Sequence, residues 1–354
     1  LTVSEWADAE RRLSAESAAE PGRWYTSRAE YQRGIMDAVS DPTVTSVVVM
    51  ASSQVGKTEI INNIVGFHID QDPAPIMVIQ PTLDMARAWS KDRLAPMLRD
   101  TPALKGKVAD PRSRDSGNTI EHKSFPGGHL TIVGANSPAG LSMRPIRIVL
   151  CDEVDRYPAS AGKEGDPVNL ARKRSLRFWN RKFVAISTPT IKGASRIEAL
   201  YEESDKQQLY VPCPDCKHLQ LLEWANVKWP EGEPAKAEYM CVECGSLWDD
   251  AQRWAAVLSG EWRASAPFDG TAGFAINEIY STMSQLGDMA SEFVTAKKLP
   301  ETLQTFVNTA LGQTWELLGA TLSPDPLYNR REVYGGPVPE PVVLITAGLD
   351  TQPD

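Results

Sequence analysis

The chain has 354 residues, of which 42% are hydrophobic and 23% charged, and its formal net charge is −9. This composition is that of a soluble globular protein, and the length predicts one large domain with smaller modules. No apolar stretch is long enough to cross a bilayer and residues 1–20 lack a signal-peptide core, so a cytoplasmic protein without a membrane partner is expected. The acidic balance excludes a surface that coats nucleic acid indiscriminately, because such binding depends on phosphate neutralisation by Lys and Arg. The chain begins with Leu rather than Met, so we expect the natural N-terminus to lie upstream.

Two helical stretches, 5–19 and 28–39, precede the first predicted strand, and residues 1–40 are interpreted as an N-terminal helical segment. An aromatic ring just upstream of a phosphate loop can stack on an adenine, and an amide there can hydrogen-bond to its edge. Tyr31 and Gln32 are candidates for that contact. Packing and helix capping are an equally good interpretation of both side chains.

A phosphate-binding loop is predicted where the apolar run from Val47 leads into Gly56-Lys57-Thr58 at the start of a helix. In such a loop, backbone N–H groups surround the β-phosphate, a lysine reaches the β/γ oxygens and a hydroxyl binds Mg²⁺. Ala51 stands at the first glycine position of the motif, so a chance match on a solvated loop is the alternative. The preceding strand and the following helical repeat favour the phosphate loop. The predicted nucleotide contacts are Ser53, Gln54, Val55, Gly56, Lys57, Thr58 and Glu59.

Strands that alternate with helices predict an α/β fold with a parallel sheet and right-handed crossovers. After the phosphate-loop helix, a strand at 75–81 is followed by a helix at 82–98. Further strands are expected at 130–134, 148–151 and 183–188, and the core is assigned to 41–208.

Residues 147–153 form a second apolar run that ends in two acids, Asp152 and Glu153. Ligands bind at the carboxyl ends of strands in an open α/β sheet, so this run suits a Walker B element. Asp152 would hold Mg²⁺ through water and Glu153 would polarise the attacking water. An acidic strand end that faces solvent is the lesser alternative.

The strand at 183–188 ends in Ser187 and Thr188, two hydroxyls at the same predicted edge. This position can sense the γ-phosphate and transmit its loss to a moving element. A plain turn with Ser/Thr capping is the alternative.

A basic stretch at 170–182 interleaves Lys and Arg with Phe178 and Trp179. A solvated helix face is as good an interpretation as a functional one. The functional alternatives are a contact with DNA, or an arginine offered to the nucleotide of a neighbouring subunit.

Four of the five cysteines form two C-x-x-C hooks, a spacing that predicts a closed structural Zn²⁺ site. Two disulfides are the weaker alternative, because cytoplasmic thiols are kept reduced. His218 could compete as a ligand only in principle, and Cys151 is interpreted as a packing residue. The module is assigned to 209–249, with the ligands Cys213, Cys216, Cys241 and Cys244.

The remaining chain divides into three predicted parts. Residues 250–322 are expected to be mostly helical, and the Pro- and Gly-rich segment 323–341 reads as a linker. Residues 342–354 begin a new strand, so we expect a further domain that the end of the chain interrupts.

In this order, the parts resemble the large subunit of a tailed-phage terminase, the motor that packages double-stranded DNA into procapsids, and most closely its lambda-like branch. The resemblance rests on SSQVGKTE at 52–59, QPT at 80–82, RIVLCDEVDRYP at 147–158, STPT at 187–190, the two cysteine hooks, and AGLDTQ at 347–352. It implies a P-loop NTPase core of the additional-strand, catalytic-glutamate type, with a parallel sheet flanked by helices and an inserted zinc ribbon. It also implies a C-terminal nuclease of RNase H type, whose first metal-binding acid is Asp350.

The resemblance also implies roles for the candidate residues. Lys57 and Thr58 bind the phosphates and Mg²⁺, Asp152 completes the metal site, Glu153 is the catalytic carboxylate, and Ser187-Thr188 is the coupling motif. Many terminases carry a basic residue before the Gly-Lys-Thr, whereas this chain has Ser52, Ser53 and Gln54, so an arginine acting in cis from that position is absent. The candidates for an arginine acting across a ring interface are Arg144, Arg147, Arg172 and Arg174.

The expected function is therefore a Mg²⁺-dependent ATPase that translocates double-stranded DNA in the host cytoplasm. Its expected cofactors are ATP, Mg²⁺ and structural Zn²⁺, and its partners are DNA, the small terminase subunit, the portal protein and further copies in a ring. Nuclease activity is not expected from these residues, because two-metal cleavage needs several carboxylates. The alternatives are a superfamily-2-like helicase, which needs a second motor domain, and a zinc-ribbon assembly factor with ATP as a structural ligand.

Overall fold

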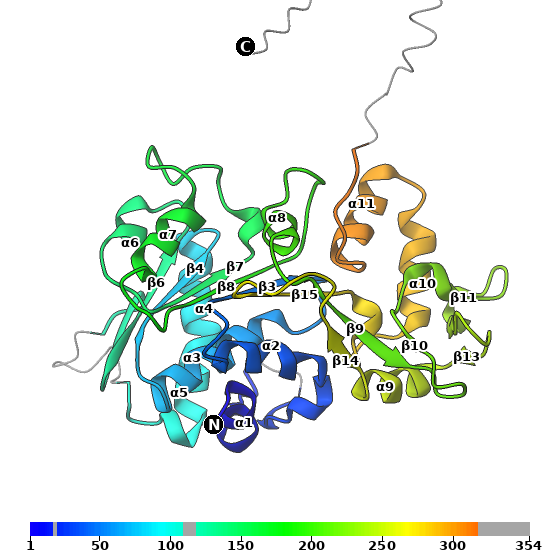
Figure 1. The fold of residues 1–354 in the computed structure, drawn as a ribbon, viewed down its shortest axis with the longest axis horizontal. Coiled ribbons are helices and arrows are strands. Elements are labelled where there is room, and N and C mark those ends of the chain that lie inside the picture. Colours follow the sequence, from blue (N-terminus) through cyan, green and yellow to red (C-terminus); the bar gives the residue numbers. More distant parts are fainter. Residues whose placement is uncertain (17–19, 109–117, 318–354) are drawn as a thin grey trace, which may run out of the picture. The chain divides into compact units, whose positions relative to one another are not determined.

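The computed structural model describes residues 1–16, 20–108 and 118–317 (Figure 1). The chain divides into two units, Leu1–Glu316 and Leu317–Asp354. The predicted linker at 323–341, the predicted strand at 342–354 and Asp350 lie outside the described residues. Among the described residues, no helix combines the length and apolarity needed to span a membrane.

A ten-stranded sheet forms the centre of the first unit, in the order β10-β9-β15-β3-β8-β7-β4-β6-β5, with β14 paired to β9. All neighbours from β9 to β6 are parallel, and β10, β14 and β5 add antiparallel edges. The prediction of an α/β protein with a mostly parallel sheet is confirmed. The strands are β3 (Ser46–Ala51), β4 (Pro75–Gln80), β5 (His122–Phe125), β6 (Gly128–Gly134), β7 (Ile148–Asp152), β8 (Lys182–Ser187), β9 (Gln207–Pro212), β10 (Leu219–Gln220), β14 (Glu261–Arg263) and β15 (Thr271–Ile276).

Strand β8 lies between β3, which leads into the predicted phosphate loop, and β7, which carries the two acids. All three strands are buried apolar runs, as expected for a sheet covered on both faces. The register places Met50 opposite Ser187, and Asp152 opposite Ile186. The residues that follow these three strands therefore meet at one edge of the sheet.

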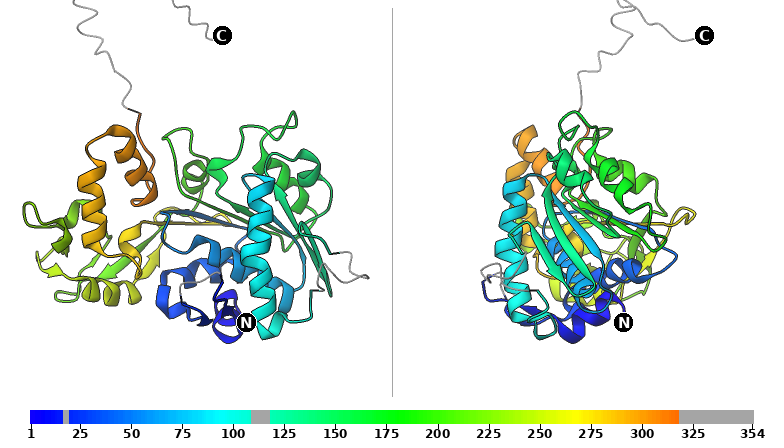
Figure 2. Two further views of the ribbon diagram at one scale, coloured as in Figure 1. Left: turned by 180° about the vertical axis from the view of Figure 1, so that it is seen from behind. Right: turned by 90° about the vertical axis from the view of Figure 1, so that its left-hand side faces the viewer.

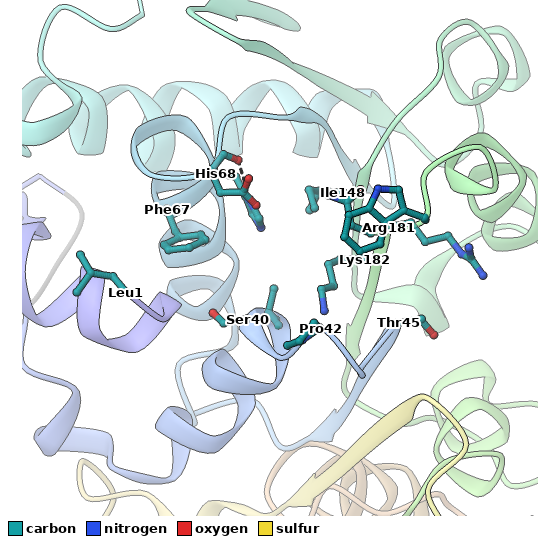
Figure 3. A pocket seen from close by; sticks show the side chains of 13 residues that line it. Leu1, Ser40, Pro42, Thr45, Phe67, His68, Ile148, Arg181 and Lys182 are labelled. Carbon is teal, nitrogen blue, oxygen red and sulfur yellow. Dashed lines mark hydrogen bonds and ion pairs between the residues drawn. The ribbon is translucent and has the colours of Figure 1, made fainter.

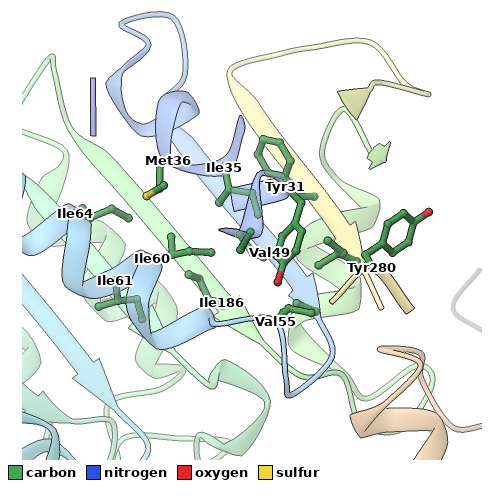
Figure 4. Packing of buried hydrophobic residues seen from close by; sticks show 14 of the residues in the cluster. Tyr31, Ile35, Met36, Val49, Val55, Ile60, Ile61, Ile64, Ile186 and Tyr280 are labelled. Atoms are coloured by element: carbon green, nitrogen blue, oxygen red, sulfur yellow. The ribbon is translucent and has the colours of Figure 1, made fainter. Parts of the chain in front are cut away.

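Helices cover both faces of the sheet (Figures 1 and 2). Val47 and Val49 point to one face and pack with the N-terminal helices, as Figure 4 shows for Ile35, Ile60 and Val49. Val48 points to the other face. The first face carries α1 (Val3–Glu10), α2 (Tyr31–Ser40), α3 (Lys57–Asp70), α4 (Leu83–Trp89) and α5 (Ala95–Asp100), and the second carries α6 (Pro138–Ser142), α7 (Pro167–Ser175) and α8 (Arg196–Glu202).

The N-terminal half departs from the sequence-based expectations in detail. The helix predicted at 5–19 ends at Glu10, and the prediction is wrong over the described residues 11–16, because Arg12–Leu13 (β1) pairs with Gly22–Arg23 (β2). The predicted helix at 82–98 consists of α4, a π-helical turn at Ser90–Leu94 and α5, which follow one another as one rod in Figure 2.

Short 3₁₀ turns occur along the chain at Thr26–Ala29, Pro102–Leu104, Val154–Arg156, Trp224–Asn226, Pro234–Lys236 and Glu278–Tyr280.

The segment 250–322 is not a purely helical remainder, which corrects that prediction. It begins with α9 (Asp250–Leu258), continues through β14 and β15, and only then forms α10 (Leu286–Ala296) and α11 (Pro300–Thr309). Strand β15 pairs in parallel with both β3 and β9, so it belongs to the centre of the sheet and the core extends beyond 208. Its sequence, TAGFAI, is short and rich in small residues, and pairing on both sides supplies the stabilisation that its local propensity lacks.

The cysteine-bearing segment is built into this fold rather than standing apart. Its first hook joins β9 to β10 and thus extends the large sheet, and its second lies in a three-stranded sheet of β11 (Val227–Lys228), β12 (Glu238–Met240) and β13 (Leu247–Trp248). Trp224 contacts both Phe293 of α10 and Phe306 of α11, with ring centroids 5.3 and 5.1 Å apart. The module therefore shares its aromatic core with the last two helices.

Candidate nucleotide and metal sites

The loop between β3 and α3 ends at Gly56, which has a φ of 77°. A Cβ at this position would overlap the side-chain nitrogen of Gln32. Both observations require glycine, because left-handed backbone is costly for other residues and the space is filled. Helix α3 starts immediately afterwards at Lys57, and the N–H groups of Glu59 and Ile60 already donate to the Gly56 carbonyl. The N–H groups of Lys57 and Thr58 come before these first bonds, at the end of the helix where backbone donors lack an intrahelical acceptor. A helix start of this kind favours an anion such as phosphate.

Other parts of the chain hold the loop from outside. The N–H of Ser52 donates to the Ile276 carbonyl (3.0 Å), and the N–H of Ser53 donates to the Thr309 carbonyl (2.7 Å). The hydroxyl of Ser53 also donates to the Thr309 carbonyl (3.1 Å). Ser53, which was predicted to contact the nucleotide, thus uses its described hydrogen bonds within the protein. The carbonyl of Gln54 accepts from Ser281, and that of Val55 accepts from Gln32.

Lys57 is folded into the sheet edge and is only 6% exposed. Its ammonium donates to the Ser52 carbonyl (2.8 Å) and to Thr188 Oγ1 (2.6 Å), and it lies 3.4 Å from Glu153 Oε1. Burial lowers the pKa of Lys57, and the nearby carboxylates of Glu153 and Asp152 oppose that shift. The lysine is thus a buried cation whose partners come from three strand ends.

Asp152 is buried at the end of β7 and accepts a hydrogen bond from Gln80 Nε2 (2.9 Å). Burial raises the pKa of Asp152 to about 6, because the charged carboxylate is poorly solvated there. A divalent cation at this place would favour the ionised form and compensate for the burial. Gln80 ends the neighbouring strand β4, and the carboxyl-edge rule that selected Asp152 could have selected it too.

Glu153 adopts a φ of 53°, an uncommon conformation for a residue with a side chain. Its Oε2 lies 3.4 Å from the backbone N–H of Thr188 and 3.5 Å from the Ser187 hydroxyl. Arg156 Nε is 3.9 Å from the same oxygen. Backbone strain of this kind persists only where the surroundings enforce it, and it often marks a functional site.

Ser187 and Thr188 lie between the lysine and the glutamate. Thr188 accepts from Lys57, while the Ser187 hydroxyl accepts from the N–H of Asp155 (3.2 Å). Asp155 in turn accepts from the N–H of Ile197 (2.8 Å) at the start of α8. A continuous set of hydrogen bonds therefore joins the strand ends to α8, and sequence reasoning did not identify Asp155 or Arg156 as part of it.

The two predicted adenine-side residues differ in their surroundings. Tyr31 is 3% exposed and packs in the core beside Val49 and Val55 (Figure 4). Gln32 donates from Nε2 to the Val55 carbonyl (2.8 Å), whereas its Oε1 is buried with no hydrogen-bond partner among the described residues. An unsatisfied buried acceptor is costly, so Gln32 is the better candidate for a polar ligand contact.

Glu59, another predicted nucleotide contact, uses its carboxylate elsewhere. It pairs with the buried guanidinium of Arg11 at 2.8 Å. Its side chain therefore fastens α3 to the N-terminal segment.

The four predicted trans arginines have local contacts in the described structure. Arg144 lies 3.2 Å from a ring nitrogen of His122, and Arg174 donates to the Ser142 carbonyl (3.2 Å). Arg172 stacks on the ring of Phe183, 4.0 Å from its centroid. Among the described residues, none of the four predicted arginines, Arg147 included, contacts Lys57, Asp152 or Glu153.

Arg147 lies at the opposite, amino edge of the sheet, where it pairs with Asp72. A cavity of about 240 Å³ opens beside it, lined by residues such as His68, Ile148 and Lys182 (Figure 3). Because parallel sheets bind ligands at their carboxyl edge, this cavity is not the expected nucleotide site.

The four hook cysteines converge, with their Sγ atoms all within 4.8 Å of one another. The Cys213–Cys244 and Cys216–Cys241 pairs are each 3.8 Å apart. Sulfurs about 2.3 Å from a tetrahedral Zn²⁺ would be separated by about 3.8 Å, so the four thiols fit the ion. His218 is not part of this cluster, and Cys151 is buried in the core as predicted.

The two hooks have the same backbone design. Each is followed by a residue in the left-handed region, Lys217 (φ 63°) after the first and Gly245 (φ 73°) after the second. The N–H of Lys217 donates to the Cys213 carbonyl and that of Gly245 to the Cys241 carbonyl, both at 3.1 Å. The matched turns bring the two pairs of thiols toward one point.

Fold and site together define an α/β protein with a glycine-bearing loop, a buried lysine and two acids at the carboxyl edge of its sheet. The sequence matches the family described as "Phage terminase large subunit gpA, ATPase domain" over residues 18–262 and that described as "Terminase large subunit gpA, endonuclease domain" over residues 271–354. The chain belongs to the phage terminase large subunit family. The second match begins at β15, inside the large sheet, and not at the predicted boundary of 342.

Individual relatives agree with this assignment. The terminase large subunit of Enterobacteria phage P21 is 29% identical over 99% of this chain, and that of Escherichia phage lambda is 27% identical over 100%. The chain spans 59% of the length of either relative. The structure of this chain is also similar to the crystal structure of the HK97 bacteriophage large terminase, with a TM-score of 0.53 and 14% sequence identity. The superposition covers 89% of this chain and 56% of the HK97 chain, and this likeness concerns the fold alone.

Proposed function

We propose that this chain is the ATP-hydrolysing motor of a terminase that moves double-stranded DNA into a procapsid in the host cytoplasm. The observation that carries the proposal is the convergence of Lys57, Asp152, Glu153 and Thr188 at the ends of three adjacent strands. A P-loop NTPase core with an additional strand between the loop strand and the acidic strand accounts for this arrangement. The position of β8 between β3 and β7 supports it.

In this proposal the residues of the chain have distinct tasks. Bound Mg²⁺ would neutralise phosphate charge, and Thr58 and Asp152 would hold it. Lys57 would exchange its present bonds to Ser52 and Thr188 for phosphate oxygens. Glu153 would then lose its contact with Lys57 and could orient a water molecule, while Thr188 would respond to the change and pass it through Ser187 to Asp155.

Completion of the site by a neighbouring copy in a ring is part of the proposal. Arg144, Arg147, Arg172 and Arg174 remain the candidates, and their local contacts would have to open for such a role. Arg156 is a separate candidate that would act within its own chain, because its side chain is 60% exposed and lies near Glu153. An arginine that stabilises transition-state charge contributes about 10³–10⁵-fold to turnover in related chemistry.

The proposal is tested by Mg²⁺-dependent phosphate release over a range of protein concentrations, with and without linear DNA. The comparison includes Lys57→Ala and Glu153→Gln. We expect turnover per chain to rise with concentration, Lys57→Ala to lose ATP binding, and Glu153→Gln to bind ATP but lose at least about 100-fold in turnover. Normal hydrolysis by Glu153→Gln would refute the assignment. Binding without any hydrolysis, even with DNA, would favour an assembly factor that uses ATP as a structural ligand.

DNA cleavage, the small-subunit and portal contacts, and a structural Zn²⁺ ion belong to the same proposal. The endonuclease-domain match over 271–354 supports a nuclease in the whole protein, with Asp350 as one metal-binding acid. We expect no cleavage from the 354 residues alone, because a two-metal site needs further carboxylates. A plasmid-nicking assay with Mn²⁺ checks this, and nicking that Asp350→Ala abolishes would contradict it.

A further inference from the structure

The two cysteine hooks and the phosphate loop are joined by one short segment, 277–284. This segment follows β15 and leads into α10. It lies beside β3 because β15 pairs with that strand along its whole length, from Thr271 opposite Ser46 to Ile276 opposite Ala51. The end of β15 and the start of the phosphate loop are therefore neighbours.

The first hook is fastened to this segment at the base of its hairpin. The buried Tyr280 hydroxyl donates to the Leu209 carbonyl of β9 and accepts from the N–H of Leu222, both at 2.8 Å. Asn277 Nδ2 donates to the Leu222 carbonyl, also at 2.8 Å. A change in the separation of the two hairpin strands would therefore shift the hydroxyl of Tyr280.

The second hook reaches the same segment through α9, which follows β13. Arg253 of this helix is fully buried, and it donates to the carbonyls of Ile279, Ser281 (3.0 Å) and Ser284 (2.6 Å). Asp250 balances its charge at 2.7 Å. One side chain thereby fixes three carbonyls of the segment.

The segment contacts the phosphate loop through Ser281. This fully buried hydroxyl donates to the Gln54 carbonyl (3.1 Å) and accepts from the N–H of Met283 (3.2 Å). Gln54 precedes Val55, whose carbonyl is held by Gln32. The position of the loop backbone therefore depends on where Ser281 is held.

We propose that the 277–284 segment couples metal occupancy of the four cysteines to nucleotide affinity of the phosphate loop, with Ser281 as the positioning residue. The inference rests on the proposed function, since it needs ATP to bind at the loop and Zn²⁺ at the thiols. Loss of the metal releases both hooks, and with them the anchors of Tyr280 and Arg253. A less preorganised loop binds its ligand more weakly, and by linkage ATP strengthens metal binding by the same factor.

The test uses the full chain and measures the affinity for a fluorescent ATP analogue with Mg²⁺, before and after removal of Zn²⁺ by a chelator. We expect about tenfold weaker binding after metal removal, within the usual range for coupled sites. Ser281→Ala should weaken binding about three- to tenfold while one Zn²⁺ per chain remains bound, and metal removal should have little further effect on it. The matched control is Ser284→Ala, whose hydroxyl bonds Glu278 within the segment and not the loop.

The outcomes of this experiment distinguish a failure of the proposed coupling from a failure of the proposed function. Equal nucleotide affinity with and without Zn²⁺, or equal affinity of Ser281→Ala and Ser284→Ala, overturns the coupling. If metal removal unfolds the whole chain, as circular dichroism would show, the comparison of the two serine variants in zinc-loaded protein decides alone. A zinc-loaded wild-type chain that does not bind the analogue, or a chain that binds no Zn²⁺, would instead refute the proposed function.

Discussion

The nucleotide site and the cysteine module are assembled in opposite ways. The module gathers four thiols from two hooks of the same local design, each ending in a left-handed residue. The nucleotide site gathers single side chains such as Gln32, Lys57, Asp152 and Thr188 from elements far apart in the chain. Each cysteine hook is itself a local turn, whereas every part of the nucleotide site depends on the completed sheet. The two regions should therefore respond differently to substitution.

Loss of one metal ligand should give the largest effect on stability. We expect Cys241→Ser to release the metal and melt the module locally, because thiolate coordination supplies most of the folding free energy of such small sites. Zinc content and the near-ultraviolet signal of Trp224, Trp229 and Trp248 report it. Cys151→Ser is the matched control, since this buried cysteine lies outside the cluster and should keep one Zn²⁺ per chain. Equal zinc content in both variants would contradict the prediction.

A substitution at the phosphate loop should act on the other region. Gly56→Ala should lower the free energy of unfolding by about 1–3 kcal/mol and weaken ATP binding, because of its positive φ and its overlap with Gln32. Gly193→Ala is the matched control, with a φ of 78° and open space for its Cβ. Chemical denaturation should show the smaller loss, about 1 kcal/mol, for Gly193→Ala. Indistinguishable losses would show that Gln32 moves aside at little cost.

The buried acid gives the nucleotide site a pH dependence of its own. The folded pKa of Asp152 is about 6, above the ordinary 3.8, so the folded state holds the proton more tightly than the unfolded state. The ligand-free chain should therefore lose stability as pH rises from about 4 to about 6, by roughly 1–3 kcal/mol. Asp152→Asn should remove that loss. Melting temperatures of both proteins across this window check it, and parallel curves would contradict it.

The smallest effect is expected within the metal hooks. Lys217 stands where the second hook has Gly245, so Lys217→Gly should stabilise the zinc-loaded module by up to about 1 kcal/mol. The reciprocal change, Gly245→Lys, should destabilise it by a similar amount. Urea unfolding followed by tryptophan fluorescence measures both. A destabilising Lys217→Gly would show that the lysine side chain, which contacts the Pro214 carbonyl, matters more than the backbone.

The predictions that rested on short-range patterns agree with the structure in part. The run before Gly56, the run before Asp152 and the C-x-x-C spacing are signals within a few residues, and the structure forms β3, β7 and the thiol cluster at those places. The helix predicted at 5–19 failed because β1 finds its partner in β2, and β15 was missed because its short, small-residue sequence carries a weak strand signal. Both errors are cases in which pairing partners overrode local propensity.

Residue types and short spacings are enough to predict the chemistry: a lysine and a hydroxyl at a helix start, two acids after an apolar run, and four thiols in pairs. Which of these groups meet depends on how distant segments pair in the fold. The fold places β8 between the loop strand and the acidic strand, turns Glu59 toward Arg11 and buries Tyr31 in the core. It also brings Asp155, Arg156 and Ser281 to the site, although the sequence analysis assigned them no role. Hydrogen bonds and burial between distant segments depend on strand order and register, which are properties of the whole sheet and not of any short stretch of sequence.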